Sequence, residues 1–322
     1  MPLILKLIFV ASGLLSLSAT TAFAQAWPAR PIELVHGFGA GGNADTVARV
    51  IAAPLSEALG KPINVIARPG AGGNIASDYV ARSQPDGYTL GLLVGGHSVS
   101  AALYKRLAFD PLNDFAFISS VSVNPFVIAV RKDSPIRDLP DLISRAKGEP
   151  GRFTFSSVGV GSTQHLTGEM FALRAGIRLT HVPYRGGVQA LTDLLGGSID
   201  MMVDTITVTR AAIEQGQIRA LGVTSAETWP ALPDTPPIKF VIPDFSVISW
   251  IGIAAPARTP SDIIERLAVE LKRTLADADV RRKLEQSGAR VQASTPEELR
   301  QLVSSEIARW SDIIAKAGIE KQ

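Results

Sequence analysis

The feature that most constrains this chain is a repeated alternation of short β-branched runs with helical patterns. A predicted strand at 32–35 is followed by apolar residues at helical spacing from Asp45 to Leu59, and the next predicted strand covers 63–67. Such alternation is typical of parallel strands joined by helices that cover both faces of a sheet. The sequence therefore predicts an α/β fold with mostly parallel sheets flanked by helices.

The alternation restarts beyond Pro111, which indicates a second α/β unit, and a length of 322 residues also fits two domains. Three helices predicted near the C-terminus carry apolar stripes, and we expect them to cover the first unit. That domain is then discontinuous in sequence. The predicted division places domain 1 at 25–124 and 251–322 and domain 2 at 125–250, with connecting strands near 126–130 and 249–255.

The first 24 residues have the three parts of a secretory signal peptide. A short basic start ends at Lys6, an uncharged apolar stretch runs from 7 to 17, and Ala22-Phe23-Ala24 provides a small-x-small cleavage site. The apolar stretch is shorter than the roughly 20 residues that span a bilayer. We therefore expect residues 1–24 to be removed and the mature protein to act outside the cytoplasm, in the periplasm.

Composition excludes several classes of protein. With 46% hydrophobic residues the chain can bury a core, which excludes wholesale disorder. The 32 Lys and Arg residues nearly balance the 30 Asp and Glu residues, so no basic surface is indicated and no nucleic-acid partner is expected. Cysteine is absent, which excludes disulfides, thiolate nucleophiles and cysteine ligands to a metal.

Three glycine-rich loops follow predicted strands and precede predicted helices, at 39–43, 70–74 and 159–163. Glycines let the backbone turn its N–H groups outward at the start of a helix, where an anion can bind. Each loop alone also fits a plain tight turn. Three such loops in both halves of the chain favour a shared anionic ligand, and carboxylate and phosphate both remain open.

Parts of the sequence also fit two enzymatic alternatives. Gly37, Gly39 and Gly42 match the G-x-G-x-x-G pattern of a dinucleotide site, and Arg68 after the second strand would suit the 2′-phosphate of NADP. Alternatively, Ser162 and His165 near the third loop are spaced as the pair of an exported hydrolase. The four histidines have no metal-ligand spacing, so no metal site is predicted.

Several strings, in this order, resemble one family, the periplasmic receptors of tripartite tricarboxylate transporters, also called Bug-type solute-binding proteins. The similarity extends from about Pro28 to Ile319. Each string alone is a weak indicator of the family, but the strings in this order are specific to it. The strings are Gly41-Gly-Asn-Ala-Asp-Thr-Val-Ala-Arg49, Arg68-Pro-Gly-Ala-Gly-Gly-Asn-Ile75, Pro85-Asp-Gly-Tyr-Thr-Leu90, Gly159-Val-Gly-Ser-Thr-Gln-His-Leu166, His181-Val-Pro-Tyr-Arg-Gly186, Asp193-Leu-Leu-Gly-Gly197 with Asp200, and Glu306-Ile-Ala-Arg-Trp310.

The resemblance implies a two-domain periplasmic binding protein of the Venus flytrap, type II-like kind, with a ligand cleft between the domains. It implies a receptor and not an enzyme, without a cofactor, that captures a small carboxylate or acidic amino acid and delivers it to the membrane permease subunits of a transporter. A monomer is expected. The ligand contacts that it implies are Phe38, Gly41, Gly42, Asn43, Asp45 and Gly73 in domain 1, and Gly161, Ser162, Thr163 and Asp204 in domain 2.

The sequence departs from the family pattern at several positions. Gly37 and Ala40 stand where the first loop commonly has proline, and Arg210 stands at a position that is usually apolar. If Arg210 faces the cleft, its planar donor group would favour a diacid. If it faces outward it is a surface charge, and the sequence leaves both orientations open.

Overall fold

The computed structural model describes residues 27–322, so the predicted signal peptide lies outside the described residues. The strands are β1 (Ile32–His36), β2 (Ile63–Ala67), β3 (Thr89–Val94), β4 (Phe115–Arg131), β5 (Thr154–Ser157), β6 (Thr180–Pro183), β7 (Met201–Thr205), β8 (Ile218–Val223), β9 (Ile248–Pro256) and β10 (Arg290–Val291). The helices are α1 (Asn43–Leu59), α2 (Asn74–Ala81), α3 (Gly96–Leu103), α4 (Leu139–Gly148), α5 (Thr163–Ala175), α6 (Gly187–Gly196), α7 (Ile206–Glu214), α8 (Ser261–Ala276), α9 (Ala278–Gln286) and α10 (Pro296–Ala317).

The strands follow the order β2-β1-β3-β9-β4-β7-β5-β6 across the molecule. At one end β1 pairs in parallel with β2 and β3, and at the other end β5 pairs in parallel with β6 and β7. In the middle, β9 runs antiparallel to β3 and β4. The fold is therefore α/β, as predicted, with two mainly parallel groups joined by antiparallel strands.

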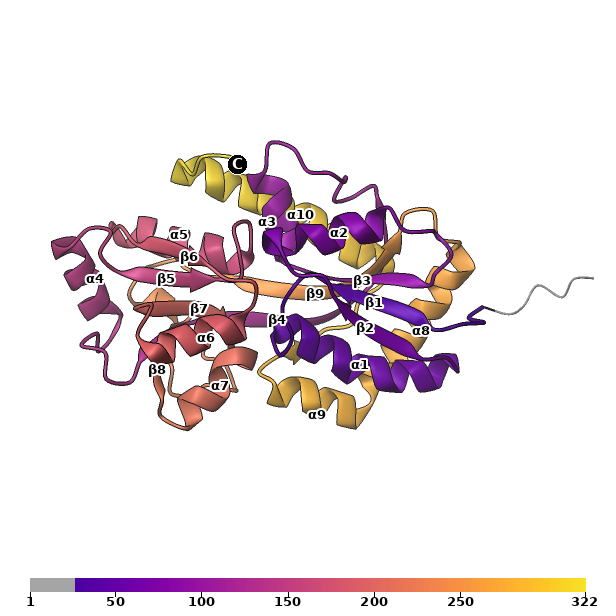
Figure 1. Ribbon diagram of the computed structural model, residues 1–322, viewed down its shortest axis with the longest axis horizontal. Helices are drawn as coiled ribbons and strands as arrows, with labels where there is room; N and C mark the ends of the chain where they lie inside the picture. The colour runs from indigo at the N-terminus through magenta and orange to yellow at the C-terminus, as the bar shows by residue number, and fades with distance from the viewer. Residues whose placement is uncertain (1–26) are drawn as a thin grey trace, which may run out of the picture.

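Strand β4 belongs to both groups. Residues 115–125 pair with β9, whereas residues 126–131 pair with β7 on one side and β8 on the other. The change of partners falls at Pro125 and Phe126. Figure 1 shows the resulting two lobes, with β4 and β9 running through the centre between them. We call the part with β1–β3, α1, α2, α8 and α9 the first lobe, and the part with α4–α7 and β5–β8 the second lobe.

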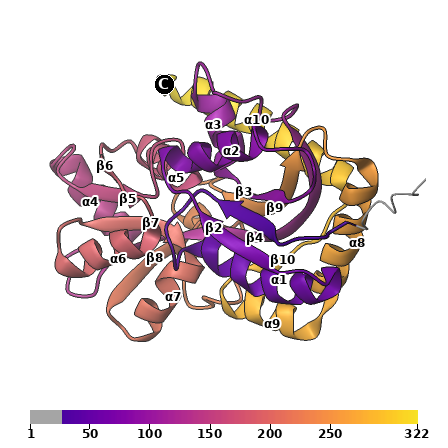
Figure 2. The ribbon, with the colours of Figure 1, turned by 45° about the vertical axis from the view of Figure 1, so that its right-hand side comes forward.

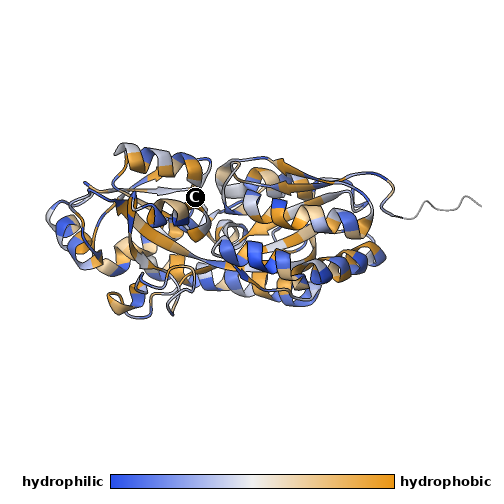
Figure 3. Cartoon of the chain, turned by 90° about the horizontal axis from the view of Figure 1, so that it is seen from below, coloured by the Kyte–Doolittle hydropathy of each residue, from blue (hydrophilic) through white to orange (hydrophobic). Residues whose placement is uncertain are grey.

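Helices cover both faces of each group of strands, so most strands are buried on both sides. In the first lobe α1 and α8 pack on one face and α2 on the other, and in the second lobe α4 and α5 lie opposite α6 and α7. Figure 3 shows that the central strands are mainly hydrophobic and that the outer helices are amphipathic, with hydrophilic and hydrophobic residues. Within residues 27–322, no helix has both the length and the apolar character that a membrane span requires.

The last helix, α10, contacts both lobes. Leu299 near its start lies against Gly252 of β9, whereas Trp310 and Ile314 near its end are buried in the same apolar cluster as Phe171 and Phe245 of the second lobe. Arg309 also donates a hydrogen bond to the Ser246 carbonyl at 2.7 Å. The C-terminal helix therefore packs along both lobes and not along the first alone.

The predicted strand at 126–130 is only the second half of β4. The first half was missed because serines and Asn124 interrupt its apolar pattern, although these polar residues are fully buried. Their polar groups are partly satisfied within the protein, since the backbone N–H of Ser120 donates to Ser294 at 2.9 Å and Ser294 N–H donates to Ser119 at 3.0 Å. The sequence predicts the three C-terminal helices at about 261–276, 279–287 and 296–316, and the structure confirms these bounds to within one residue.

Candidate functional site

A cavity lies between the lobes, next to the strands that connect them. Its volume is about 30 Å³, larger than the roughly 10–15 Å³ that one water molecule needs. The first lobe contributes Phe38, Gly42, Asn43, Ala44 and Val94, the second lobe Val158, Thr163, Gln164, Gly187, Asp204, Thr205 and Val208, and the connecting strands Phe126 and Ser249. The cavity therefore combines apolar walls with a few polar groups, as small-molecule sites usually do.

Four helices begin at this cavity. Gly42 is the N-cap of α1, Thr163 is the first residue of α5, Gly187 is the first residue of α6, and Thr205 is the N-cap of α7. The first N–H groups of a helix have no partner inside it and carry partial positive charge. The described residues that line the cavity include no Lys or Arg. Positive potential here therefore comes from backbone groups, which suits an anionic ligand.

Three of the four helices that begin at the cavity lack a side-chain cap. Among residues 27–322, no N-cap side chain accepts a hydrogen bond from the first-turn N–H groups of α1, α6 or α7. Away from the cavity, α4, α9 and α10 are capped by Asp138, Asp277 and Thr295, whereas α8 has no side-chain cap. In α5 the Ser162 hydroxyl accepts from His165 N–H at 3.2 Å. Free backbone donors thus remain where a ligand can supply the acceptor.

Two hydroxyl groups stand at the inner end of the cavity. The Thr163 Oγ1 atom is buried and has no hydrogen-bond partner within the protein. A methyl group placed on Gly95 would lie 3.0 Å from this oxygen and 2.7 Å from Ser249 Oγ, so both hydroxyls lie close to Gly95. An unpaired buried hydroxyl costs free energy unless a partner satisfies it. Thr163 is therefore a candidate contact to a bound molecule.

Among the described residues that line the cavity, Asp204 has the one carboxyl group, and it is 2% exposed. Its Oδ1 accepts a hydrogen bond from the Thr205 N–H at 2.7 Å. Burial raises the pKa of Asp204 to about 6, although hydrogen bonds from Thr205 and Gln164 act in the opposite direction. Near neutral pH this side chain therefore changes easily between an acceptor and a proton donor.

The glycine loops also let the lobes approach each other closely. A Cβ atom on Gly72 in the first lobe would lie 2.6 Å from the Val160 carbonyl oxygen in the second. On the other side of the cavity, Gly39 N–H donates to the Arg185 carbonyl at 3.1 Å, and a Cβ atom on Gly186 would lie 3.2 Å from Gly39 Cα. Glycine is required at positions 72 and 186 because a Cβ atom there would lie too close to the backbone of the opposite lobe. The sequence does not reveal this role.

Asp45 lies behind the first glycine loop and does not line the cavity. Its carboxylate accepts hydrogen bonds from Gly41 N–H at 2.9 Å and Arg49 Nε at 3.0 Å, and lies 3.2 Å from Nε2 of the fully buried His36. Burial alone would raise the pKa of Asp45, but the bonds from Arg49 and Gly41 and the positive charge of Arg49 outweigh it and lower the pKa. The ionised side chain therefore orients the loop amides.

The predicted contacts divide into two sets. The structure brings Phe38, Gly42, Asn43, Thr163 and Asp204 together around the cavity. The remaining predicted residues lie outside its lining: Gly41 and Asp45 support the first loop, Gly73 packs against the Phe38 ring, Gly161 packs against Tyr104, and Ser162 caps α5. A ligand role for either set stays a prediction.

Sequence reasoning missed nine of the fourteen lining residues. Val94, Phe126, Val158 and Ser249 lie in or directly after strands, and Val208 lies in the first turn of α7, where their pattern indicates only core. Gln164 had a signal, because it follows the predicted cap Ser162 in the first turn of a helix. Gly187 and Thr205 had the same signal, a position at the start of a helix after a strand.

The geometry does not support the hydrolase pair. The Ser162 hydroxyl donates to the Gly159 carbonyl at 2.7 Å and accepts from the backbone of His165, and these contacts hold it away from the role of a nucleophile. The His165 ring stacks on His181 with 4.2 Å between ring centroids, and burial lowers the pKa of His165 to about 4.

The geometry also does not support a dinucleotide site at the first glycine loop. The face of the first glycine loop is covered by the second lobe through Gly39, and Arg68 stacks on the Tyr79 ring at 3.7 Å. A pyrophosphate group therefore has no open approach to the loop amides. Among residues 27–322, no group of three His, Asp or Glu side chains is arranged to hold a metal ion.

Arg210 does not line the cavity. Its Nε lies 2.6 Å from a carboxylate oxygen of Glu214 on the same helix, and its Nη1 donates to the Gln286 carbonyl in the first lobe at 2.7 Å. The side chain is 33% exposed. The orientation into the cavity is therefore wrong, and the outward-facing side chain also connects the lobes outside the cavity.

We predict that Asp45→Ala lowers the free energy of unfolding by about 1–3 kcal/mol, because it leaves Gly41 N–H and the buried His36 without their acceptor. Urea titration measures this loss. Asp141→Ala is the matched control, since Asp141 also accepts from an arginine and a backbone N–H but is more exposed, at 13% against 6% for Asp45. An equal, small loss in both variants would contradict the role of Asp45.

Comparison with known proteins gives one consistent result. Residues 47–319 match the model of the tripartite tricarboxylate transporter family receptor. The periplasmic binding protein BugD is 35% identical and superposes with a TM-score of 0.89, covering 92% of this chain and 100% of its own. MatC from Rhodopseudomonas palustris, solved with bound malate, is 34% identical with a TM-score of 0.86 over 89% of this chain and 100% of its own. A second R. palustris protein, solved with adipate, is 35% identical with a TM-score of 0.88 over 91% of this chain and 99% of its own.

Proposed function

Because the chain belongs to the tripartite tricarboxylate transporter receptor family, we propose that it is a solute-binding receptor that captures a small carboxylate between its two lobes. Two similar proteins that were solved with carboxylates, malate and adipate, support the ligand class. In this proposal the domains are 25–124 with 251–322, and 125–250, and β4 and β9 serve as the hinge between them.

The observation that carries the proposal is the convergence of four helix N-termini on one cavity without a cationic side chain. Backbone N–H groups there donate to the ligand carboxylate, and the buried Thr163 hydroxyl adds a further donor. Phe38, Phe126 and Val208 contact the carbon skeleton. The ligand contacts from the sequence that we retain for this role are Phe38, Gly42, Asn43, Thr163 and Asp204, and we assign the others to loop support.

The setting of this activity is also part of the proposal. We infer that the protein acts in the periplasm, after removal of residues 1–24, and passes its ligand to the permease subunits of a tripartite transporter. The family name and the periplasmic location of BugD support this. We further infer that the receptor acts as a monomer and without catalysis of its own.

The ligand class is tested by thermal unfolding with a panel of carboxylates that includes malate, adipate, aspartate and glutamate. A ligand at about 100 times its dissociation constant should add about 2.7 kcal/mol to the free energy of unfolding and remain unconsumed. Hexanediol, which has the chain of adipate without its charges, is the control compound and should have no effect. Turnover of the ligand, or stabilisation by nicotinamide dinucleotides alone, would contradict the proposal.

A further inference from the structure

Three consecutive backbone carbonyls at the end of α9, from 286 to 288, each accept a hydrogen bond from a side chain of the second lobe. The pairs are Arg210 Nη1 to Gln286 at 2.7 Å, Thr207 Oγ1 to Ser287 at 2.8 Å and Trp229 Nε1 to Gly288 at 2.9 Å. Helix α9 itself packs on α1 and α8 in the first lobe. Figures 1 and 2 both show α7 beside α9, below the central strands.

The carbonyls at the C-terminus of a helix lack partners inside the helix and carry partial negative charge. The guanidinium of Arg210 is therefore well matched to Gln286, and its ion pair with Glu214 holds it in that direction. Gly288 has a φ of +87°, and a Cβ atom there would collide with the Ile206 side chain at the start of α7. The backbone at Gly288 therefore packs directly against the Ile206 side chain at this point.

Thr207 connects this contact to the cavity. Its Oγ1 lies 2.8 Å from the Ser287 carbonyl oxygen and also 2.8 Å from Oδ1 of Asn43, which lines the cavity. A hydroxyl has only one proton to donate. The Ser287 and Asn43 oxygens therefore share the Thr207 hydroxyl as a donor, and this hydroxyl bridges the end of α9 and Asn43.

We propose that Arg210 and Thr207 are positioning residues of the ligand site, which hold the end of α9 against α7 when the lobes are together and so fix Asn43. Neither residue needs to touch the ligand. Separation of the lobes would leave three carbonyls and the Nη1 group of Arg210 without their partners. The inference goes beyond the proposed function, and its test needs no ligand, so the two can fail independently.

The test measures the distance between the lobes in the ligand-free protein. Since the chain has no cysteine, spin labels can be attached at Glu57→Cys in the first lobe and Glu149→Cys in the second, both exposed positions. Pulsed electron paramagnetic resonance then gives the populations of short and long distances. The test variants are Arg210→Met and Thr207→Val, and Thr207→Ser keeps the hydroxyl as the conservative variant.

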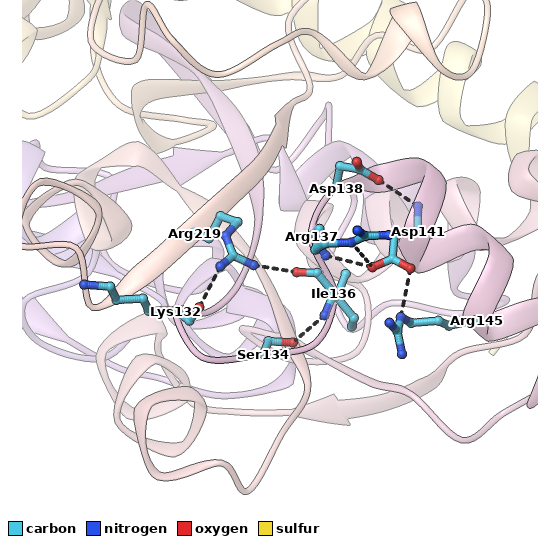
Figure 4. A network of polar contacts seen from close by, with 8 residues as sticks. All are labelled: Lys132, Ser134, Ile136, Arg137, Asp138, Asp141, Arg145 and Arg219. Carbon is cyan, nitrogen blue, oxygen red and sulfur yellow. Dashed lines mark hydrogen bonds and ion pairs between the residues drawn. The ribbon is translucent and has the colours of Figure 1, made fainter.

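The matched control is Arg219→Met. Arg219 also donates to two backbone carbonyls, those of Ile136 at 2.8 Å and Lys132 at 2.7 Å, but all three residues belong to the second lobe (Figure 4). Its loss removes the same kind of contact without affecting the lobes' separation. Circular dichroism of every variant checks that the protein is folded.

We expect Arg210→Met and Thr207→Val each to raise the ratio of open to closed protein about tenfold, which corresponds to about 1.4 kcal/mol. Thr207→Ser and Arg219→Met should match the parent. If Arg210→Met does not fold, the comparison of Thr207→Val with Thr207→Ser decides. Distributions identical to the parent in both test variants would overturn the proposal, as would a parent that shows only the long distance.

Discussion

Gly72→Ala should weaken carboxylate binding about 10- to 100-fold while leaving the protein folded. A Cβ atom at this position would lie 2.6 Å from the Val160 carbonyl and 3.1 Å from Ser162 N, both in the opposite lobe. Such overpacking costs about 1–3 kcal/mol, and it arises only when the lobes are together. Calorimetry with the carboxylate identified in the thermal panel measures the affinity.

The matched control for this variant is Gly60→Ala. Gly72 and Gly60 have similar φ values of +63° and +69°, so alanine strains the backbone alike at both, but nothing lies within 4 Å of a Cβ atom on Gly60. Both variants should therefore lose similar stability, and only Gly72→Ala should lose affinity. X-ray scattering with ligand should also show a larger radius of gyration for Gly72→Ala. Equal affinities in the two variants would refute closure around Gly72.

Asp204→Asn should abolish a loss of stability that the parent protein shows between about pH 4 and pH 6. The pKa of Asp204 is about 6 in the folded protein and 3.8 at its usual value. Between these values the folded state keeps the proton and the unfolded state releases it, so the free energy of unfolding falls as pH rises. A difference of about two pKa units amounts to on the order of 3 kcal/mol.

Urea titrations from pH 4 to pH 7 measure the free energy of unfolding of variant and parent. The effect appears as a change with pH in the difference between these two free energies. The asparagine keeps an oxygen to accept from Thr205 N–H, so the amide fits the site without a charge. Asp133→Asn, whose carboxylate is 69% exposed, is the control and should follow the parent's pH dependence. If the free energies of unfolding of Asp204→Asn and the parent differ by the same amount at every pH, burial does not shift the pKa of this carboxyl.

Local patterns were enough to predict most of the fold. β2 begins and ends at the predicted residues, and the Ser162 cap of α5 is present with its hydrogen bond. Both follow from signals within a few residues, namely a β-branched run and a hydroxyl three residues before a free N–H. The pairing of β9 between β3 and β4 has no such signal, because it joins segments about 130 to 160 residues apart.

The site was predictable only in part, for the same reason. Gly42 and Thr163 lie in glycine loops that the sequence predicts as anion sites, whereas Phe38 was implied by the family resemblance alone. Phe126 and Ser249 were missed because a residue in a buried strand looks the same whether it packs in the core or lines a cavity. Arg210 was left open because its carbonyl partner lies 76 residues away.

The position of β9 has a consequence for the order in which the chain acquires its structure. Strand β3 is bordered by β1 and β9, so its second edge stays unpaired until residues 248–256 are available. The second lobe, in contrast, closes its strands with residues up to 223. A chain that is synthesised from its N-terminus must therefore carry an open, apolar strand edge from the completion of β3 until β9 is available. Such edges invite pairing with other chains. Because β9 both joins the lobes and completes the sheet of the first lobe, the first lobe is the last to be completed.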